Sequence, residues 1–145
     1  MRRVLFFSLV ATTILAIALG AALTSSEAAQ QGQQFQQVNI RVNCANGQVS
    51  DTSIVPWNVR ASRQAQQQIR WRLLPASDID SATIRPKSTS SWPFASQAPI
   101  TVTSGGNAWV DSGAITGANG EYHYDVVVNC GSGPHVIDPR MDIDP

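Results

Sequence analysis

The sequence predicts an all-β protein, an antiparallel β-sandwich of about seven or eight strands. Three observations support this fold class. Short segments of alternating apolar and polar residues recur at intervals of roughly 8–12 residues. Turn-forming Asn, Gly and Pro residues separate these segments, and no long amphipathic helical pattern competes with them. The chain of 145 residues has room for one domain of ordinary size.

The first 28 residues have the parts of a secretory signal peptide. Arg2 and Arg3 precede an apolar run over residues 4–23, and the small residues Ser26 and Ala28 stand just before the expected cut. Cleavage after Ala28 would leave a secreted or periplasmic chain of 117 residues without membrane attachment. The alternative is an uncleaved anchor, because an apolar run of this length can span about 30 Å of hydrocarbon as a helix.

Residues 29–37 (AQQGQQFQQ) predict a disordered, glutamine-rich leader. Its one apolar side chain, Phe35, cannot bury enough surface to offset the entropy lost on ordering. The β-domain is therefore expected over residues 38–145. It begins with Val38–Cys44, which alternates without a fault and predicts the first strand, and Asn46-Gly47 predicts a tight turn after it.

The remaining strands are expected over Ile54–Val59, Gln68–Leu74, Ser81–Arg85, Ile100–Thr103, Trp109–Ile115, Glu121–Cys130 and Val136–Ile143. Pro56 is typical of an edge or a bulge. In Gln68–Leu74 the alternation directs Trp71 to the core and its two arginine neighbours away from it. Residues 87–98 are expected to form a loop. Residues 104–107 tolerate positive φ and predict a hairpin between the two strands that flank them.

The only two cysteines, Cys44 and Cys130, predict a structural disulfide. Each ends a predicted strand with the same text, Val-Asn-Cys. Two such strands can lie side by side with level ends, which would bring the Cα atoms within about 5.5–6 Å of each other. An oxidising compartment favours the bond. The Cys-x-x-Cys spacing of redox-active pairs is missing from the sequence.

The charges of the secreted chain nearly balance. Eight basic and nine acidic residues remain after the signal segment, so there is no global field for nucleic acid or anionic lipid. Residues 41–87 hold seven basic against three acidic residues, and residues 88–145 hold one basic against six acidic. We expect the two halves to neutralise each other once their strands interleave in a sheet.

Residues 120–126, Gly-Glu-Tyr-His-Tyr-Asp-Val, resemble the start of the C-terminal strand of cupredoxins, whose pattern is Gly-x-Tyr-x-(Phe/Tyr)-x-Cys. The Trp71 strand and Trp92-Pro93-Phe94 stand in similar order. The chain end, residues 137–145, is similar to a group of small bacterial proteins of cupredoxin-like fold labelled DP-EP, which carry an Asp-Pro element in the last strand. The resemblance implies a Greek-key sandwich, cupredoxin-like or immunoglobulin-like, and no activity.

In cupredoxins that cysteine, a following histidine, a methionine and a second histidine hold copper. Val126 stands where the thiolate belongs, which removes the ligand that defines a blue-copper site. Cys130, His135 and Met141 have similar spacing and form the alternative, a copper-binding or electron-transfer protein. A disulfide would occupy that thiolate, and His123 lies about 23 Å along the strand on its other face. No cofactor is therefore expected.

Catalytic motifs are missing from the sequence, which has only two histidines, no Gly-x-Ser-x-Gly, no His-Glu-x-x-His and no phosphate-binding loop. We expect a non-enzymatic protein. The acidic pairs Asp78/Asp80 and Asp142/Asp144 are most simply solvated surface, although carboxylates two apart on a strand suit calcium or acid–base work.

The four tryptophans are the better functional signal. Trp92, in Ser-Ser-Trp-Pro-Phe, lacks alternating context and is the candidate for an exposed ligand-binding side chain. We therefore expect an exported interaction or binding module of the cell envelope, with an unknown protein or glycan as partner. A carbohydrate-binding module that uses Trp92 is the alternative. Nucleic acid is excluded as a partner, because Trp71 of Arg70-Trp71-Arg72 should face the core.

Overall fold

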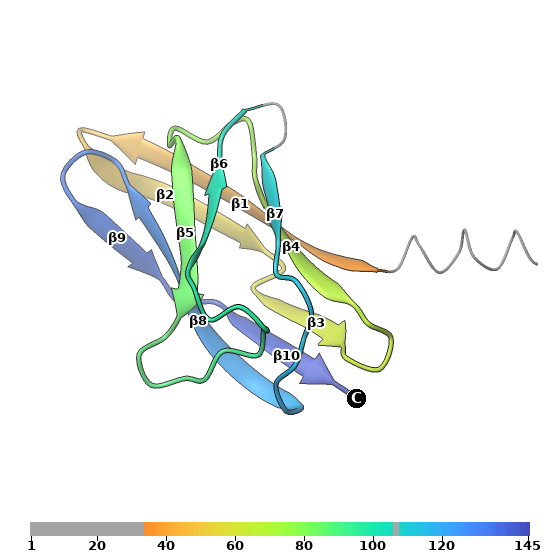
Figure 1. Ribbon diagram of the computed structural model, residues 1–145. Coiled ribbons are helices and arrows are strands. Elements are labelled where there is room, and N and C mark those ends of the chain that lie inside the picture. Colours follow the sequence, from red (N-terminus) through yellow and green to blue (C-terminus); the bar gives the residue numbers. More distant parts are fainter. Residues whose placement is uncertain (1–33, 106–107) are drawn as a thin grey trace, which may run out of the picture. The chain divides into compact units, whose positions relative to one another are not determined.

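The computed structural model describes residues 34–105 and 108–145, which form strands and loops without a helix. The strands are β1 Phe35–Ala45, β2 Gln48–Val55, β3 Asn58–Ser62, β4 Gln68–Leu73, β5 Ser81–Pro86, β6 Ile100–Thr103, β7 Trp109–Asp111, β8 Gly120–Asn129, β9 Pro134–Ile137 and β10 Arg140–Asp144 (Figure 1). The all-β prediction is confirmed. The predicted signal peptide, residues 1–28, lies outside the described residues.

The strands form a sandwich of two sheets (Figure 1). One sheet has four strands in the order β2-β1-β4-β7, and the other has the order β3-β10-β8-β5-β6, with β9 paired to β8. Both sheets are mixed, because β1 runs parallel to β4 and β10 runs parallel to β3. The prediction of an antiparallel sandwich of seven or eight strands is therefore wrong for the direction of these two pairs. It is also wrong for the number of strands, which is ten in the described residues. Alternation within a strand does not encode the direction of its neighbour.

Strand β1 begins three residues before the predicted start. Phe35, Gln36 and Gln37 pair in parallel with Gln68–Arg70 of β4. The predicted disordered leader over 29–37 is therefore wrong for its last three residues, whose backbone groups find partners in the neighbouring strand. Residues 29–33 lie outside the described residues.

The chain changes sheet at residues 56–57. The predicted strand Ile54–Val59 is wrong, since Val55 ends β2 in the four-stranded sheet and Asn58 begins β3 in the six-stranded sheet. Pro56, which has no backbone N–H to give to a ladder, lies in the bend between them.

A crossing between the sheets also replaces the predicted hairpin around residues 104–107. Strand β6 pairs with β5, whereas β7 pairs with β4 in the other sheet. Of the predicted turn, Gly106 and Asn107 lie outside the described residues. Strand β7 also ends at Asp111, four residues earlier than expected. Ser112 continues the contact with β4, because its hydroxyl accepts the backbone N–H of Ile69 at 3.0 Å.

Trp71 lies at the centre of the core. As predicted, the alternating residues Ile69, Trp71 and Leu73 are fully buried. The Trp71 ring meets Phe94 edge-on at 5.9 Å between centroids, and it meets Tyr124 at 6.1 Å. These rings come from β4, from the loop after β5 and from β8, so one aromatic cluster connects both sheets and a loop.

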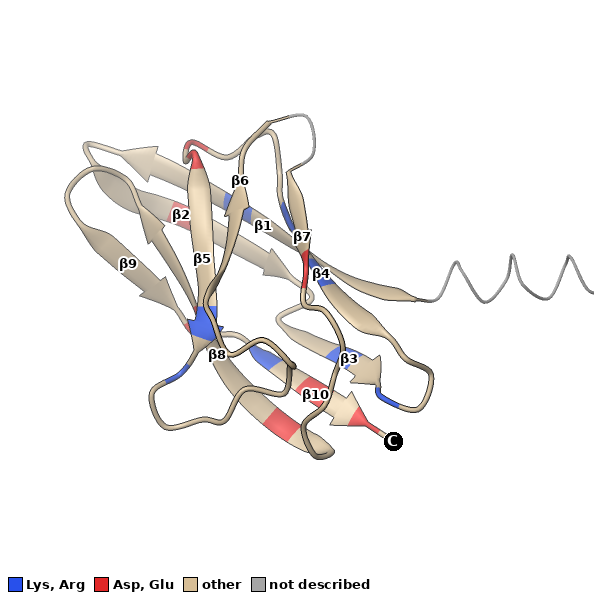
Figure 2. Ribbon diagram, in the orientation of Figure 1, with Lys and Arg blue, Asp and Glu red and all other residues tan. Residues whose placement is uncertain are grey.

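The two halves of the chain neutralise each other as predicted. Four ion pairs join a basic residue of the first half to an acidic residue of the second: Arg60–Asp142, Arg70–Asp111, Arg85–Asp125 and Lys87–Asp138. Figure 2 shows the acidic segment of β7 beside the basic segments of β4. The uneven charge along the sequence is therefore largely balanced in the fold.

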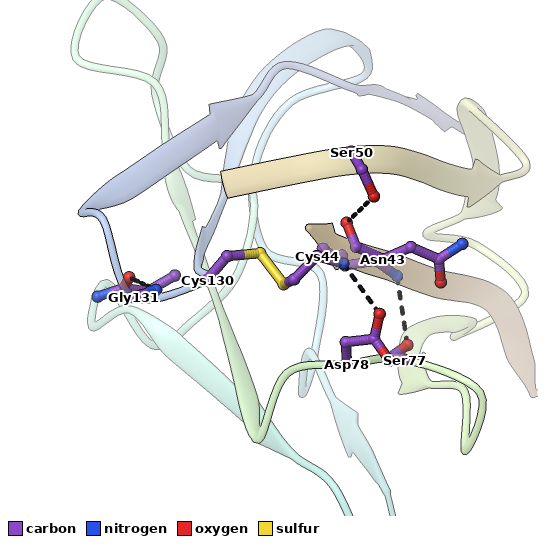
Figure 3. The surroundings of a disulfide bond; sticks show 9 residues. Asn43, Cys44, Ser50, Ser77, Asp78, Cys130 and Gly131 are labelled. Carbon is purple, nitrogen blue, oxygen red and sulfur yellow. Dashed lines mark hydrogen bonds between the residues drawn. A yellow bond between two sulfur atoms is a disulfide. The ribbon is translucent and has the colours of Figure 1, made fainter. Parts of the chain in front are cut away.

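The Cys44–Cys130 disulfide is present, with 5.6 Å between the Cα atoms (Figure 3). The predicted geometry is wrong in one respect, because the two strands are not neighbours. Cys44 belongs to β1 in the four-stranded sheet, and Cys130 follows β8 in the six-stranded sheet. The bond links the sheets. Asp78 holds the same place from a third segment, since its carboxylate accepts the backbone N–H of Cys44 at 2.9 Å (Figure 3).

We predict that removing this bond destabilises the domain. The bond spans a sequence separation of 86 residues, and chain-entropy arithmetic gives a loss of at most roughly 4–5 kcal/mol for the Cys44→Ala/Cys130→Ala variant. Urea unfolding of oxidised wild type and of the variant measures the difference. Two titratable thiols in denatured, non-reduced wild type would contradict the structure.

We predict alkaline sensitivity from Tyr124. Burial raises the pKa of Tyr124 from 10.0 to about 12, and the Trp71 indole opposes this shift in part. The neutral phenol is therefore favoured in the folded state, so its contribution is complete below pH 10 and is lost as pH rises toward 12. The thermal unfolding midpoint of Tyr124→Phe should therefore fall less steeply with pH over this range than the midpoint of wild type. Parallel pH profiles would contradict the assignment.

Candidate functional site on the outer face of the four-stranded sheet

Trp92 does not lie at the surface, and the prediction of an exposed ligand-binding side chain there is wrong. Its side chain is 6% exposed and packs edge-on against Phe94 at 4.9 Å. The loop returns to the domain because Phe94 is fully buried and its backbone pairs with Ile115. The exposed tryptophans are Trp57 (47%) and Trp109 (44%).

The alternative copper ligands are not brought together. The sulfur of Cys130 is bonded to Cys44, and Met141 is fully buried. His135 lies on β9, opposite Val128 of β8. His123 lies on β8 itself, opposite Arg140 of β10, so the two histidines occupy different positions along β8. Residues 34–105 and 108–145 contain no group of three or more His, Cys, Asp or Glu side chains placed to hold a metal ion.

The acidic pairs have structural partners. Besides the Asp78 contact at the disulfide, Asp142 accepts hydrogen bonds from Asn58 at 2.8 Å and from Arg60 at 3.3 Å. These bonds join β10 to β3. One carboxylate of each pair thus has a structural partner, and among the described residues neither pair belongs to a group of three or more His, Cys, Asp or Glu side chains placed to hold a metal ion.

Trp109 belongs to the outer face of the four-stranded sheet, where β7 begins. Strand register places Val55, Asn39, Arg72 and Trp109 in one row across all four strands. The next row holds Gln37, Arg70 and Asp111. All these side chains lie opposite the core-facing set that contains Trp71, because successive side chains of a strand point to opposite faces.

Arg70 is held rigidly in this face. Its guanidinium donates two hydrogen bonds to the Asp111 carboxylate, at 2.6 and 2.9 Å. Its Cζ lies 3.8 Å from the centroid of the Phe35 ring and 5.5 Å from that of Trp109. The hydrogen bonds to Asp111 raise the pKa of Arg70 further above its ordinary value. A bidentate ion pair between two rings leaves little rotamer freedom, so both rings are pre-positioned.

A hollow of about 420 Å³ opens at the end of this face where β1 and β4 begin. We call it the glutamine hollow; it is lined by Gln34, Arg63, Gln66, Gln67, Gln68, Ala114 and Ile115. Gln68 pairs with Phe35 in the β1–β4 register, so the hollow adjoins the ring that stacks on Arg70. Side-chain amides both donate and accept hydrogen bonds, and they suit a ligand rich in hydroxyl groups.

Sequence reasoning missed both parts of this surface. The sequence predicts Trp109 in a hairpin strand, Gln68 at the start of the strand Gln68–Leu74 and Gln34 in the disordered leader. One signal was present: Arg70 and Arg72 flank a core tryptophan, so an aromatic residue paired with them from a neighbouring strand must share their outer face.

Comparison of the chain with protein-family models and with curated proteins finds no match. The class that the fold defines is a disulfide-linked β-sandwich of two mixed sheets. Within the described part of the chain, no helix is long and apolar enough to cross a membrane.

We predict stability losses of different size for two tryptophans. Trp92→Ala should cost about 3–5 kcal/mol, because it empties a buried site. Trp109→Ala should cost about 1 kcal/mol or less, because a side chain 44% exposed loses mainly its contact with Arg70. Chemical denaturation followed by circular dichroism measures both values. A larger loss for Trp109→Ala than for Trp92→Ala would reverse the assignment.

Proposed function

We propose that this protein is an exported, non-enzymatic binding module that recognises a glycan with the outer face of its four-stranded sheet. The observation that carries the proposal is Trp109, an exposed indole on the outer face of the four-stranded sheet. Exposed aromatic rings stack on the apolar faces of sugar rings, and neighbouring amides and arginines take the hydroxyl groups.

Two further features support this proposal. The Arg70–Asp111 pair fixes the surface before any ligand arrives, which reduces the ordering cost of binding. The glutamine hollow provides hydrogen-bonding groups within reach of the same face. The disulfide supports a location in the periplasm or outside the cell, because such bonds persist in oxidising compartments.

The resemblance to cupredoxins and to the DP-EP group implies a fold and no activity. The motif Gly120–Val126 lies within β8, and Val126 is a fully buried side chain in the middle of that strand. With Cys130 bonded to Cys44, electron transfer through a copper thiolate has no support from the described residues.

We predict that Trp109→Ala abolishes glycan binding and that Trp57→Ala does not. The two side chains are nearly equally exposed, at 44% and 47%, so Trp57→Ala is a matched control for losing a surface indole. Binding is measured on a glycan array and by affinity electrophoresis in soluble polysaccharides.

Three outcomes would contradict the proposal. These are an array without any bound glycan, glycan binding that survives Trp109→Ala, and loss of binding in Trp57→Ala alone. The last result would move the binding site to the bend between β2 and β3.

A further inference from the structure

The glutamine hollow has a single charged residue in its lining, Arg63. Arg63 donates a hydrogen bond through Nη1 to the carbonyl of Gly117 at 3.2 Å, which holds the side chain beside the hollow. Asp144 of β10 lies opposite Ser62 of β3, but it does not line the hollow. Within the described residues Arg63 forms no ion pair.

A second unneutralised arginine lies at the other end of the face. Arg72 pairs in register with Trp109 and also forms no ion pair in the part of the chain that the structure describes. Arg70, between the two ends, is neutralised by Asp111. An unneutralised positive charge therefore lies at Arg72 on the outer face and another at Arg63 beside the glutamine hollow, although the domain as a whole is nearly neutral.

The spacing of these charges favours an extended ligand. Gln68 of the hollow and Arg72 lie four residues apart on β4, or about 13 Å along a strand. Trp109 lies beside Arg72, and Phe35 lies beside Gln68. A short oligosaccharide along β4 would contact an aromatic ring and an arginine near each end.

We propose that the ligand is an acidic saccharide of the uronic-acid type, with one carboxylate bound by Arg63 in the glutamine hollow. This inference rests on the proposed function and names its substrate class. The planar guanidinium of arginine matches a carboxylate in a two-bond geometry. A neutral sugar would cover Arg63 without supplying a counter-charge, and burying an unpaired charge is costly.

Oligogalacturonate and its fully methyl-esterified form are the test probes, because esterification removes the charge of each carboxyl group and adds only a methyl group. Isothermal titration of wild type should show about 10- to 100-fold tighter binding of the acid form. Arg63→Gln should lower affinity for the acid form to that for the ester, and Arg63→Lys should restore part of it. Arg60→Gln, an exposed arginine outside the hollow, is the matched control and should leave binding unchanged.

Equal affinity for acid and ester, or full affinity in Arg63→Gln, would overturn this inference while Trp109-dependent binding of other glycans upheld the proposed function. Exclusive binding of a sulfated oligosaccharide in a parallel titration would overturn the carboxylate assignment. Absence of binding to these probes and to every arrayed glycan would overturn both proposals. Thermal unfolding of each variant verifies that the fold is retained.

Discussion

The contact of Trp71 with Tyr124 and Phe94 is the interaction on which the other features depend. The three rings come from the two sheets and from the loop after β5, and all three are fully buried. Their burial fixes β4 in one orientation. Since Arg70 and Arg72 flank Trp71 in the sequence, the same burial directs both guanidinium groups to the outer face. The candidate site is thus the reverse side of the core.

The disulfide and the bends between sheets complete this arrangement. One end of the sandwich is held by Cys44, Cys130 and the Asp78 carboxylate. The chain passes between the sheets five times, from β2 to β3, β3 to β4, β4 to β5, β6 to β7 and β7 to β8. Each sheet therefore contains strands from both the first and the second half of the chain. The ion pairs that join the halves follow from the same interleaving.

Features encoded by local alternation could be predicted. Ile100–Thr103 has the same bounds as β6, and the faces of β4 are as predicted, because each pattern has a period of two. Sheet membership could not be predicted. The segment Ile54–Val59 contains the bend between β2 and β3, and two strands joined by a short loop can belong to different sheets. Long-range pairing decides both outcomes. The parallel pairing of β1 with β4 could not be predicted from local alternation for the same reason.

The site shows the same limit of local reasoning. Trp92 lacks alternating neighbours, which suggested exposure, but Phe94 draws its loop into the core. The sequence shows Trp109 only as a residue of a predicted strand. Its position beside Arg72 depends on the register between β4 and β7, which local alternation does not encode. The pairing of Cys44 with Cys130 could be predicted, because a chain with two cysteines allows one intramolecular disulfide. The expectation that their strands are neighbours was wrong, because β1 and β8 belong to different sheets.

The position of β10 has a consequence for how the protein is made. This strand lies between β3 and β8, and β3 pairs within its sheet only with β10, so β3 has no strand partner until residues 140–144 are available. A ribosome releases the chain from its N-terminus, and a nascent domain without this strand lacks the core side chains Met141 and Ile143. The six-stranded sheet can therefore be completed only after residue 144 has been synthesised.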